Sequence, residues 1–276
     1  MFETQQNPNW CPGCGNYGIW NSLKLALQEL NLKPENIAFT SGIGCSGKIP
    51  HWIRAYCLNG LHGRALPLAE GIKIANSELI VIACGGDGDG YAEGTNHFIH
   101  YCRRNANVKY FVHDNQIYGL TKGQPSPTSN EGFITKTTPL GTIEKALNPV
   151  LIAIASGATF VARGFAGDIP HLKELMKKAI KHNGAAVIDI LQPCVTFNKV
   201  NTYEWYQKRA HKLKKPANTR IKAMRIAEQW GKKIPIGVIF ESNEKSYEQR
   251  IPLLKKSPLM KLNPKKNIKK LFNELK

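Results

Sequence analysis

Short apolar runs alternate with longer amphipathic stretches along the first 198 residues of the chain. This alternation is typical of parallel strands that are connected through helices. The pattern therefore predicts an α/β fold with a mostly parallel sheet and helices on both of its faces. The five strands predicted from the apolar runs are Asn36–Ser41, Leu79–Cys84, Val108–His113, Thr159–Arg163 and Ala185–Ile190.

A stretch with helical periodicity precedes each predicted strand. Asp168 stands where the last of these helices begins and is a suitable N-cap, because its carboxylate can accept a backbone N–H of the first turn. Residues Gly119–Thr142 are instead rich in Gly, Pro, Ser and Thr, which predicts a long loop of the kind that serves as a lid or binding loop. The predicted helices are Tyr17–Leu30, Leu66–Ala75, Glu93–Arg104, Pro149–Gly157 and Asp168–His182.

The character of the sequence changes after Asn198. A predicted helix, Arg220–Trp230, is followed by the short apolar run 234–240 and by a lysine-rich end. We therefore predict a first domain of residues 1–198 and a basic C-terminal extension of residues 199–276. The extension is expected to wrap around the first domain and to fray over about its last 15 residues, where apolar side chains are few.

The formal net charge of +18 is concentrated in the predicted extension. Residues 199–276 contain 21 Lys and Arg against 6 Asp and Glu, whereas residues 1–198 contain 17 against 14. The first domain therefore lacks the charge that is typical of nucleic-acid-binding proteins. The extension could attract an acidic partner, or it could be a solvated surface with no partner.

The overall composition is that of an ordinary globular protein, with 42% hydrophobic and 21% charged residues. This composition excludes the fibrous and low-complexity classes. The sequence has no run of about 18 apolar residues, and its start has neither the basic nor the apolar segment of a secretion signal. We therefore expect a soluble cytoplasmic protein that does not associate with membranes.

Polar loops follow four of the five predicted strands. The carboxyl ends of parallel strands lie at one edge of a sheet, where ligands commonly bind. The four loops therefore predict one ligand site at this edge. They are Gly42–Lys48, Gly85–Gly90, Asp114–Gln124 and Gln192–Cys194.

The sequence GGDGDG at residues 85–90 combines glycines, which let a backbone approach phosphate groups closely, with Asp87 and Asp89. These carboxylates would repel a diphosphate unless a divalent cation lay between them. Mg²⁺ prefers oxygen ligands and commonly takes only one or two from protein. We predict that Asp87, the amide oxygen of Asn115 and the backbone carbonyl of Ile117 hold Mg²⁺. The alternative is a tight acidic turn without a metal.

The seven cysteines are an odd number in a chain without a predicted secretion signal, which argues against a disulfide framework. Cys11 and Cys14 form a CxxC pair, while Cys45 and Cys194 lie in two loops of the predicted ligand edge. Four thiolates with this spacing suit either Zn²⁺ or a [4Fe–4S] cluster. We favour the cluster, since zinc would have no evident role beside a phosphate-bearing cofactor. The cysteines in or beside apolar runs are predicted to be buried in the core: Cys57, Cys84 and Cys102.

With the cysteines and the glycine-bearing loops in this order, the chain resembles the β subunit of the 2-oxoacid:ferredoxin oxidoreductases, which is the subunit that binds thiamine diphosphate. The resemblance covers about residues 9–206. The sequence NTYEWYQKR favours the type that uses 2-oxoglutarate. The segments that carry the resemblance are WCPGCG, SGIGCSGKIP, LHGRALPLAEGIK, GGDGDG, DNQIYGLTKGQPSPTS and LQPCVTFNKVNTYEWY.

The resemblance implies roles for the residues of these segments. Asp87, Asn115 and the carbonyl of Ile117 would hold Mg²⁺, and Lys48 and Lys122 would recognise the oxoacid. One [4Fe–4S] cluster would be bound by four cysteines, which are Cys11, Cys14, Cys45 and Cys194. Thiamine diphosphate would be contacted by Ile43, Gly44, Cys45, Ser46, His62, Gly88, Asp89, Gly119 and Leu120.

The resemblance also implies an activity and partners. A 2-oxoacid, either 2-oxoglutarate or pyruvate, would be decarboxylated and oxidised to an acyl-coenzyme A, with electrons passing through the cluster to ferredoxin. In this family the pyrimidine-binding domain and its glutamate are on an α subunit, and we expect this chain to work with such a subunit as a heterodimer. The sequence has no CxxCxxCxxxCP run, so we expect no ferredoxin-type pair of clusters in it.

Two other classes of protein remain as alternatives. A thiamine-dependent decarboxylase or synthase subunit without redox chemistry would explain GGDGDG and NQIYG, but would leave four cysteines at the site unused. A basic zinc protein that binds nucleic acid would explain the CxxC pair and the lysines, but not the glycine-bearing loops.

Overall fold

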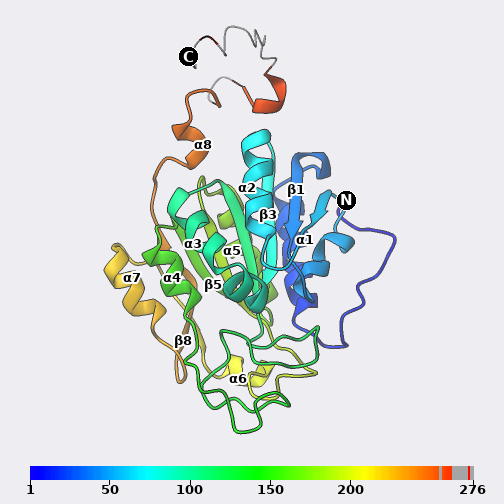
Figure 1. Ribbon diagram of the computed structural model, residues 1–276, viewed down its shortest axis with the longest axis vertical. Helices are drawn as coiled ribbons and strands as arrows, with labels where there is room; N and C mark the ends of the chain where they lie inside the picture. The colour runs from blue at the N-terminus through cyan, green and yellow to red at the C-terminus, as the bar shows by residue number, and fades with distance from the viewer. Residues whose placement is uncertain (255–256, 263–272, 274–276) are drawn as a thin grey trace.

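An eight-stranded sheet runs through the molecule in the order β2-β1-β3-β4-β6-β5-β8-β7. In this computed structural model, residues 1–254, 257–262 and 273 are described. Neighbouring strands are parallel except for β5 and β8, which pair antiparallel. The prediction of a mostly parallel sheet is confirmed (Figure 1). The strands are β1 (Ile37–Ser41), β2 (Tyr56–Asn59), β3 (Ile80–Gly86), β4 (Val108–Asp114), β5 (Phe160–Phe165), β6 (Ala186–Leu191), β7 (Ala210–Lys212) and β8 (Ile234–Glu241).

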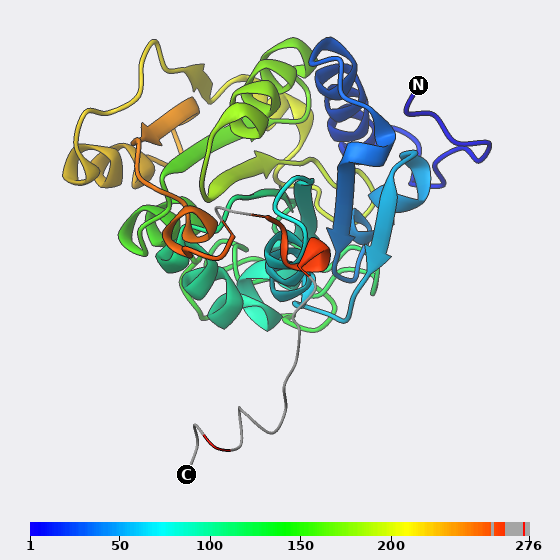
Figure 2. The ribbon, with the colours of Figure 1, turned by 90° about the horizontal axis from the view of Figure 1, so that it is seen from above.

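Helices connect most of these strands and cover the sheet (Figure 2). The first five agree with the predicted helices to within a few residues. Asp168 is the N-cap of α5, as predicted, and its side chain accepts the backbone N–H of His171 at 3.2 Å. The helices are α1 (Asn16–Glu29), α2 (Ala65–Ala75), α3 (Thr95–Arg104), α4 (Pro149–Ala155), α5 (Ile169–Lys181), α6 (Tyr203–Gln207), α7 (Arg220–Ala227) and α8 (Tyr247–Arg250).

Alternate side chains of the central strands pack on opposite faces of the sheet. In β3, Ile82 and Cys84 belong to the core that α1 and α5 cover, whereas Val81 and Ala83 belong to the core beneath α2, α3, α4 and α7. Because successive side chains of a strand point to opposite faces, a strand that is apolar at every position needs cover on both sides. The predicted helical cover of both faces is therefore confirmed.

The C-terminal region contributes strands to the same sheet. All residues of β8 except Glu241 are buried, and the strand pairs with β5 on one side and β7 on the other. The expectation that this region only wraps around the first domain is wrong for residues 234–241, because their apolar run completes the sheet. The boundary predicted at residue 198 lies between β6 and α6.

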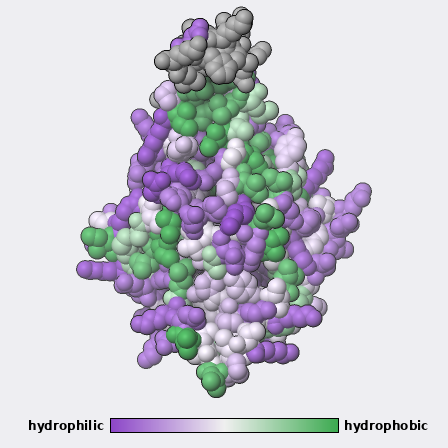
Figure 3. Space-filling model, in the orientation of Figure 1, coloured by the Kyte–Doolittle hydropathy of each residue, from purple (hydrophilic) through white to green (hydrophobic). Residues whose placement is uncertain are grey.

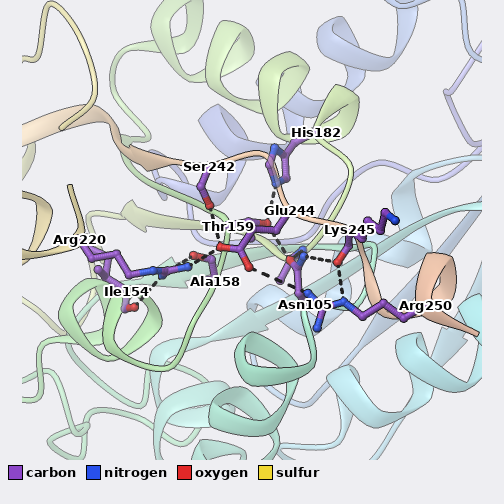
Figure 4. A network of polar contacts seen from close by, with 11 residues as sticks. Asn105, Ile154, Ala158, Thr159, His182, Arg220, Ser242, Glu244, Lys245 and Arg250 are labelled. Atoms are coloured by element: carbon purple, nitrogen blue, oxygen red, sulfur yellow. Dashed lines mark hydrogen bonds and ion pairs between the residues drawn. The ribbon is translucent and has the colours of Figure 1, made fainter. Parts of the chain in front are cut away.

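Polar contacts tie the C-terminal segment to the amino end of the sheet (Figure 4). Asn105 adopts a left-handed conformation with φ 56°, and its Oδ1 accepts the hydroxyl of Thr159 and the backbone N–H of Ala185, both at 2.7 Å. Its Nδ2 donates to the carbonyl of Lys245 at 3.3 Å. The guanidinium of Arg220 donates to the carbonyls of Ile154 and Ala158 and to Glu244. The C-terminal segment therefore packs at the amino end of the sheet, opposite the loops at its carboxyl end.

The long connection from β4 to α4 contains no helix or strand, as its composition predicts. It lies with α6 at the carboxyl end of the sheet, in the lower part of Figure 1. No helix among the described residues is both long and apolar enough to span a bilayer. Hydrophilic side chains project from both flanks of the face shown in Figure 3, and apolar groups form smaller patches between them.

Candidate active site

The loops after β1, β3 and β4 enclose a cavity of about 230 Å³ at the carboxyl end of the sheet. Tyr118 and Thr121 also line it. The structure thus brings the residues predicted to contact thiamine diphosphate to one place, together with the three predicted Mg²⁺ ligands. Those lining residues are Ile43, Gly44, Cys45, Ser46, His62, Asp87, Gly88, Asp89, Asn115, Ile117, Gly119 and Leu120.

Asp87 lines this cavity and is 2% exposed. Its Oδ2 accepts the hydroxyls of Ser126 at 2.5 Å and of Thr128 at 2.7 Å. Burial raises the pKa of Asp87, because a carboxylate loses its hydration there, while these two hydroxyls favour the charged form. A divalent cation would compensate the buried charge, so the donor set suits Mg²⁺.

Asn115 follows β4 and presents its amide beside Asp87. Its Nδ2 donates to Gln192 Oε1 at 2.9 Å, and its Oδ1 accepts the backbone N–H of Ile117 at 3.1 Å. A carbonyl oxygen has two lone pairs, so Oδ1 retains one acceptor position for a metal. Among the described residues, no group of three His, Cys, Asp or Glu side chains could hold a metal ion. The predicted Mg²⁺ ligands are of another kind, namely one carboxylate, one amide and one backbone carbonyl.

The carboxylate of Asp89 joins two other loops of the site. Its Oδ1 accepts the backbone N–H groups of Ile43 at 2.8 Å and of Gly63 at 2.7 Å, and it lies 3.8 Å from His62 Nε2. A Cβ at Gly42 would lie 2.0 Å from Asp89 Oδ2, so this approach requires glycine at position 42. Asp89 therefore fixes the backbone at Ile43 and the loop that carries His62.

Glycine is also required where the ring of Tyr118 covers the acidic loop. A Cβ at Gly88 would lie 2.2 Å from Tyr118 Cε1. The tyrosine hydroxyl lies 3.4 Å from the carbonyl oxygen of Gly88, and the ring is tilted by 57° against that of His62, with centroids 6.2 Å apart. The aromatic ring therefore forms one wall of the cavity.

A second cavity of about 240 Å³ adjoins the first. Lys48 and Lys122 line it as well, so the structure places both lysines beside the cysteines. The four cysteines predicted to bind a cluster all line this cavity: Cys11, Cys14, Cys45 and Cys194. The residues that line both cavities are Cys45, Asn115, Gly119 and Leu120.

Gly119 lies between two of the sulfurs. A Cβ at this position would lie 3.6 Å from Cys194 Sγ and 3.9 Å from Cys45 Sγ. Burial, together with the nearby sulfurs of Cys194, Cys45 and Cys11, raises the pKa of Cys14 to about 12. Thiolates at this site therefore need positive charge close by, which iron would supply.

One further polar group faces the cysteine cavity. Asn16 lines it, and the buried Nδ2 of this side chain has no hydrogen-bond partner within the described part of the chain. Its Oδ1 lies 2.6 Å from Nδ1 of the buried His113. A free donor beside four cysteines suits a cluster, whose sulfurs accept hydrogen bonds.

The other three cysteines lie outside both cavities. Cys84 and Cys102 are fully buried in the core, as predicted. The prediction for Cys57 is wrong, because it lies on the exposed edge strand β2, where its sulfur is 3.2 Å from the carbonyl oxygen of Pro50. An edge strand has a neighbour on one side only, so an apolar run there does not imply burial.

The sequence pattern alone does not indicate several residues of the site. Ser126 and Thr128 belong to the predicted binding loop, but nothing in their spacing indicates that they contact Asp87. In the sequence, Gln192 stands out only as the start of the loop after β6, and Tyr118 only as part of NQIYG. All four lie in segments that carry the family resemblance, which is the only sequence signal for them.

Two family models match consecutive parts of the chain. The model described as "Thiamine pyrophosphate enzyme, C-terminal TPP binding domain" matches residues 42–190. The model for the C-terminal part of the pyruvate ferredoxin oxidoreductase beta subunit matches residues 194–256. A 2-oxoacid:ferredoxin oxidoreductase β subunit from Saccharolobus solfataricus is 49% identical in an alignment of 272 positions that covers 93% of this chain and 88% of that protein. The chain belongs to the 2-oxoacid:ferredoxin oxidoreductase β subunits.

The family includes relatives that are named for 2-oxoglutarate. A 2-oxoglutarate oxidoreductase subunit KorB from Mycobacterium tuberculosis is 47% identical over 197 residues, which cover 71% of this chain and 53% of that protein. A solved 2-oxoglutarate:ferredoxin oxidoreductase from Magnetococcus marinus superimposes with a TM-score of 0.92 at 36% identity, covering 100% of this chain and 94% of that chain. The predicted family and its enzyme class, an oxidoreductase subunit, are confirmed.

Proposed function

We propose that this β subunit binds thiamine diphosphate, Mg²⁺ and one [4Fe–4S] cluster. We further propose that its enzyme converts 2-oxoglutarate and coenzyme A to succinyl-coenzyme A and CO₂, while the electrons released pass through the cluster to ferredoxin. The observation that carries the proposal is the pair of adjoining cavities. One is lined by the glycine-bearing acidic loop and the other by four cysteines, and they share Cys45, Asn115, Gly119 and Leu120. A short path between a cofactor that releases electrons and a cluster that accepts them is what this reaction needs.

The first cavity suits the diphosphate end of the cofactor. Asp87, Asn115 and the Ile117 carbonyl would hold Mg²⁺, and the metal would neutralise both Asp87 and the diphosphate. Bound thiamine diphosphate would supply the electron sink for decarboxylation. Backbone N–H groups of the loops after β1 and β3 would approach the phosphate oxygens, since the glycines there leave room for them.

The second cavity suits a cluster because it gathers the thiols of Cys11, Cys14, Cys45 and Cys194. Each thiolate of a [4Fe–4S] cluster ligates a different iron, so the sulfurs need to surround the cavity and not to converge on one point. Cys11 and Cys14 would hold it from the turn before α1. Cys45 and Cys194 would hold it from the loops after β1 and β6.

Lys48 and Lys122 are proposed to recognise carboxylates of the oxoacid. Lys122 is exposed, and Lys48 Nζ lies 3.3 Å from Asn9 Oδ1. Both lysines line the cavity that adjoins the cofactor cavity. An ammonium is a compact charge that suits a carboxylate, and 2-oxoglutarate has two. The Magnetococcus marinus structure is titled with 2-oxoglutarate, coenzyme A and succinyl-CoA bound, which supports the same substrate here.

The proposed partners are an α subunit and ferredoxin. Ile43 and Leu120 are 44% and 46% exposed at the cofactor cavity, and an α subunit that brings the pyrimidine-binding domain would cover them. Ferredoxin is proposed to dock on the basic C-terminal region because the positive charge of that region would attract an acidic protein. Most of the chain beyond Lys255, where the lysines are dense, lies outside the described residues.

The test is anaerobic co-expression with an α subunit, followed by analysis of iron, sulfide, Mg²⁺ and thiamine. Four iron and four sulfide per β chain, with ferredoxin reduction that depends on both 2-oxoglutarate and coenzyme A, are expected. A colourless complex that decarboxylates the oxoacid without reducing ferredoxin would favour the non-redox decarboxylase or synthase instead. Preference for pyruvate over 2-oxoglutarate would reject the proposed substrate alone.

A further inference from the structure

Gln192 lines the cysteine cavity and is 1% exposed. It follows β6, and its backbone N–H donates to the carbonyl of Asp114 at 2.8 Å. A Cβ at Gly15 would lie 2.9 Å from Gln192 Cγ, so the turn before α1 packs directly against this side chain. Packing and backbone hydrogen bonding therefore hold Gln192 in one place.

The carbonyl of Pro193 determines which way the Gln192 amide faces. Gln192 Nε2 lies 2.9 Å from this carbonyl oxygen, which can only accept a hydrogen bond. Nitrogen must therefore face Pro193, and Oε1 must face Asn115. Because Oε1 can only accept, Asn115 must turn its Nδ2 toward Gln192, and this leaves Asn115 Oδ1 facing the backbone N–H of Ile117.

The same amide nitrogen reaches the cysteine cavity. Gln192 Nε2 lies 3.4 Å from Cys14 Sγ, within hydrogen-bond distance for sulfur. An amide nitrogen has two hydrogens, so it can donate to the Pro193 carbonyl and to this sulfur at once. One side chain therefore contacts a proposed Mg²⁺ ligand through its oxygen and a proposed cluster ligand through its nitrogen.

We propose that Gln192 is a positioning residue that serves both cofactors. Through Oε1 it orients Asn115 so that the amide oxygen faces the metal. Through Nε2 it donates to the Cys14 sulfur, which stabilises the more negative, reduced state of the cluster and raises its potential. The inference depends on the proposed function, since it assigns a role toward the two cofactors proposed there.

Two substitutions separate the two contacts. Gln192→Met keeps the length of the side chain and removes both hydrogen bonds. Gln192→Glu retains an acceptor for Asn115 but removes the donor to Cys14 and adds negative charge nearby. Gln28→Leu, at an exposed position of α1, is the control for loss of a glutamine.

The test uses the intact αβ complex, purified anaerobically, with three readouts other than turnover. Iron and sulfide contents report whether the cluster is present, a redox titration followed by electron paramagnetic resonance gives its midpoint potential, and calorimetry gives Mg²⁺ affinity in the presence of thiamine diphosphate. We expect Gln192→Met to weaken Mg²⁺ binding by about tenfold or more. We also expect it to lower the reduced-to-oxidised ratio at a fixed potential by about tenfold, which is 59 mV for a one-electron couple.

For Gln192→Glu we expect at least as large a fall in potential and a smaller loss of Mg²⁺ affinity than for Gln192→Met. Gln28→Leu should match the wild type in both. A wild-type complex without iron would overturn the proposed function. Wild-type potential and Mg²⁺ affinity in a Gln192→Met complex that retains its iron would overturn the inference about Gln192 alone.

If Gln192→Met fails to retain iron, Gln192→Glu and Gln192→Asn replace it in the redox titration. The asparagine retains the amide but is shorter by one methylene, so it cannot reach Cys14 and Asn115 together. A potential unchanged from the wild type in both variants would also overturn the inference.

Discussion

The hydroxyl of Thr128 lies 2.7 Å from Asp87 Oδ2, which joins the long loop after β4 to the acidic loop after β3. The same hydroxyl lies 2.7 Å from Asp114 Oδ1. A hydroxyl has one hydrogen to donate, so Thr128 can donate to only one of the two carboxyl groups at a time. Burial, with the nearby charges of Asp189 and Asp87, raises the pKa of Asp114 well above its usual range. Thr128 therefore lies between two buried carboxyl groups and joins the loop after β4 to both of them.

Replacing Thr128 with Val should weaken binding of Mg²⁺ and thiamine diphosphate. The substitution keeps the shape of the side chain and removes a hydrogen bond to a buried carboxylate, which is worth about 1.5–3 kcal/mol. We expect about a tenfold or larger loss of Mg²⁺ affinity, measured by calorimetry with thiamine diphosphate present. Thr137→Val, at an exposed position of the same loop, is the matched control. Equal affinities in the two variants would show that the Thr128 hydroxyl does not orient Asp87.

Replacing Asp87 with Asn should abolish cofactor binding and stabilise the cofactor-free protein at neutral pH. Burial raises the pKa of Asp87, so the folded state favours the protonated form. Protonation of Asp87 therefore stabilises the folded state. This contribution is fully present below the pKa that Asp87 has in the unfolded state, and it is lost as pH rises through its pKa in the folded state. The difference in Tm between Asp87→Asn and the wild type should therefore grow from acidic to neutral pH when both lack cofactors. Thiamine diphosphate should raise Tm only in the wild type, and an equal rise in the variant would refute the metal assignment.

Serine substitutions should divide the cysteines into two groups. Replacing Cys11, Cys14, Cys45 or Cys194 should remove the iron or make the cluster unstable, because each supplies a ligand to a different iron. Cys84→Ala and Cys102→Ala should keep their iron and lose about 1 kcal/mol or more of stability from the cavity left in the core. Full iron and sulfide content in a Cys194→Ser complex would contradict the assignment. The exposed Cys57 should tolerate alanine with no loss of iron.

Replacing Lys48 or Lys122 with Ala should raise KM for the oxoacid and leave KM for coenzyme A nearly unchanged. Loss of one charge-assisted hydrogen bond to a carboxylate corresponds to about a tenfold to hundredfold effect. Steady-state kinetics of the αβ complex with 2-oxoglutarate and pyruvate would measure it. Lys136→Ala, at an exposed position of the long loop, provides the comparison. A lysine whose removal changes neither oxoacid KM is a solvated surface charge.

The central part of the fold and the location of the site can be predicted from the sequence alone. The strands from β1 to β6 that lie inside the sheet are apolar at successive positions because helices cover both faces, and such runs are visible without a structure. The loops that follow these strands carry the ligand-binding residues because parallel strands end at one edge. Asp87, Asn115 and the four cysteines could be predicted for that reason.

The arrangement of the outer strands and of the supporting residues depends instead on tertiary packing. The exposed edge strand β2 lacks a buried face, so its pattern does not distinguish it from a loop, and β8 could not be assigned to the sheet without knowing that it pairs with β5. Thr128 and Gln192 contact residues that are 41 and 178 positions away in the chain, at Asp87 and Cys14. Contacts of this kind depend on how separate loops pack at the sheet edge. The periodicity of apolar residues indicates only which face of each helix or strand is buried, so it does not predict these contacts.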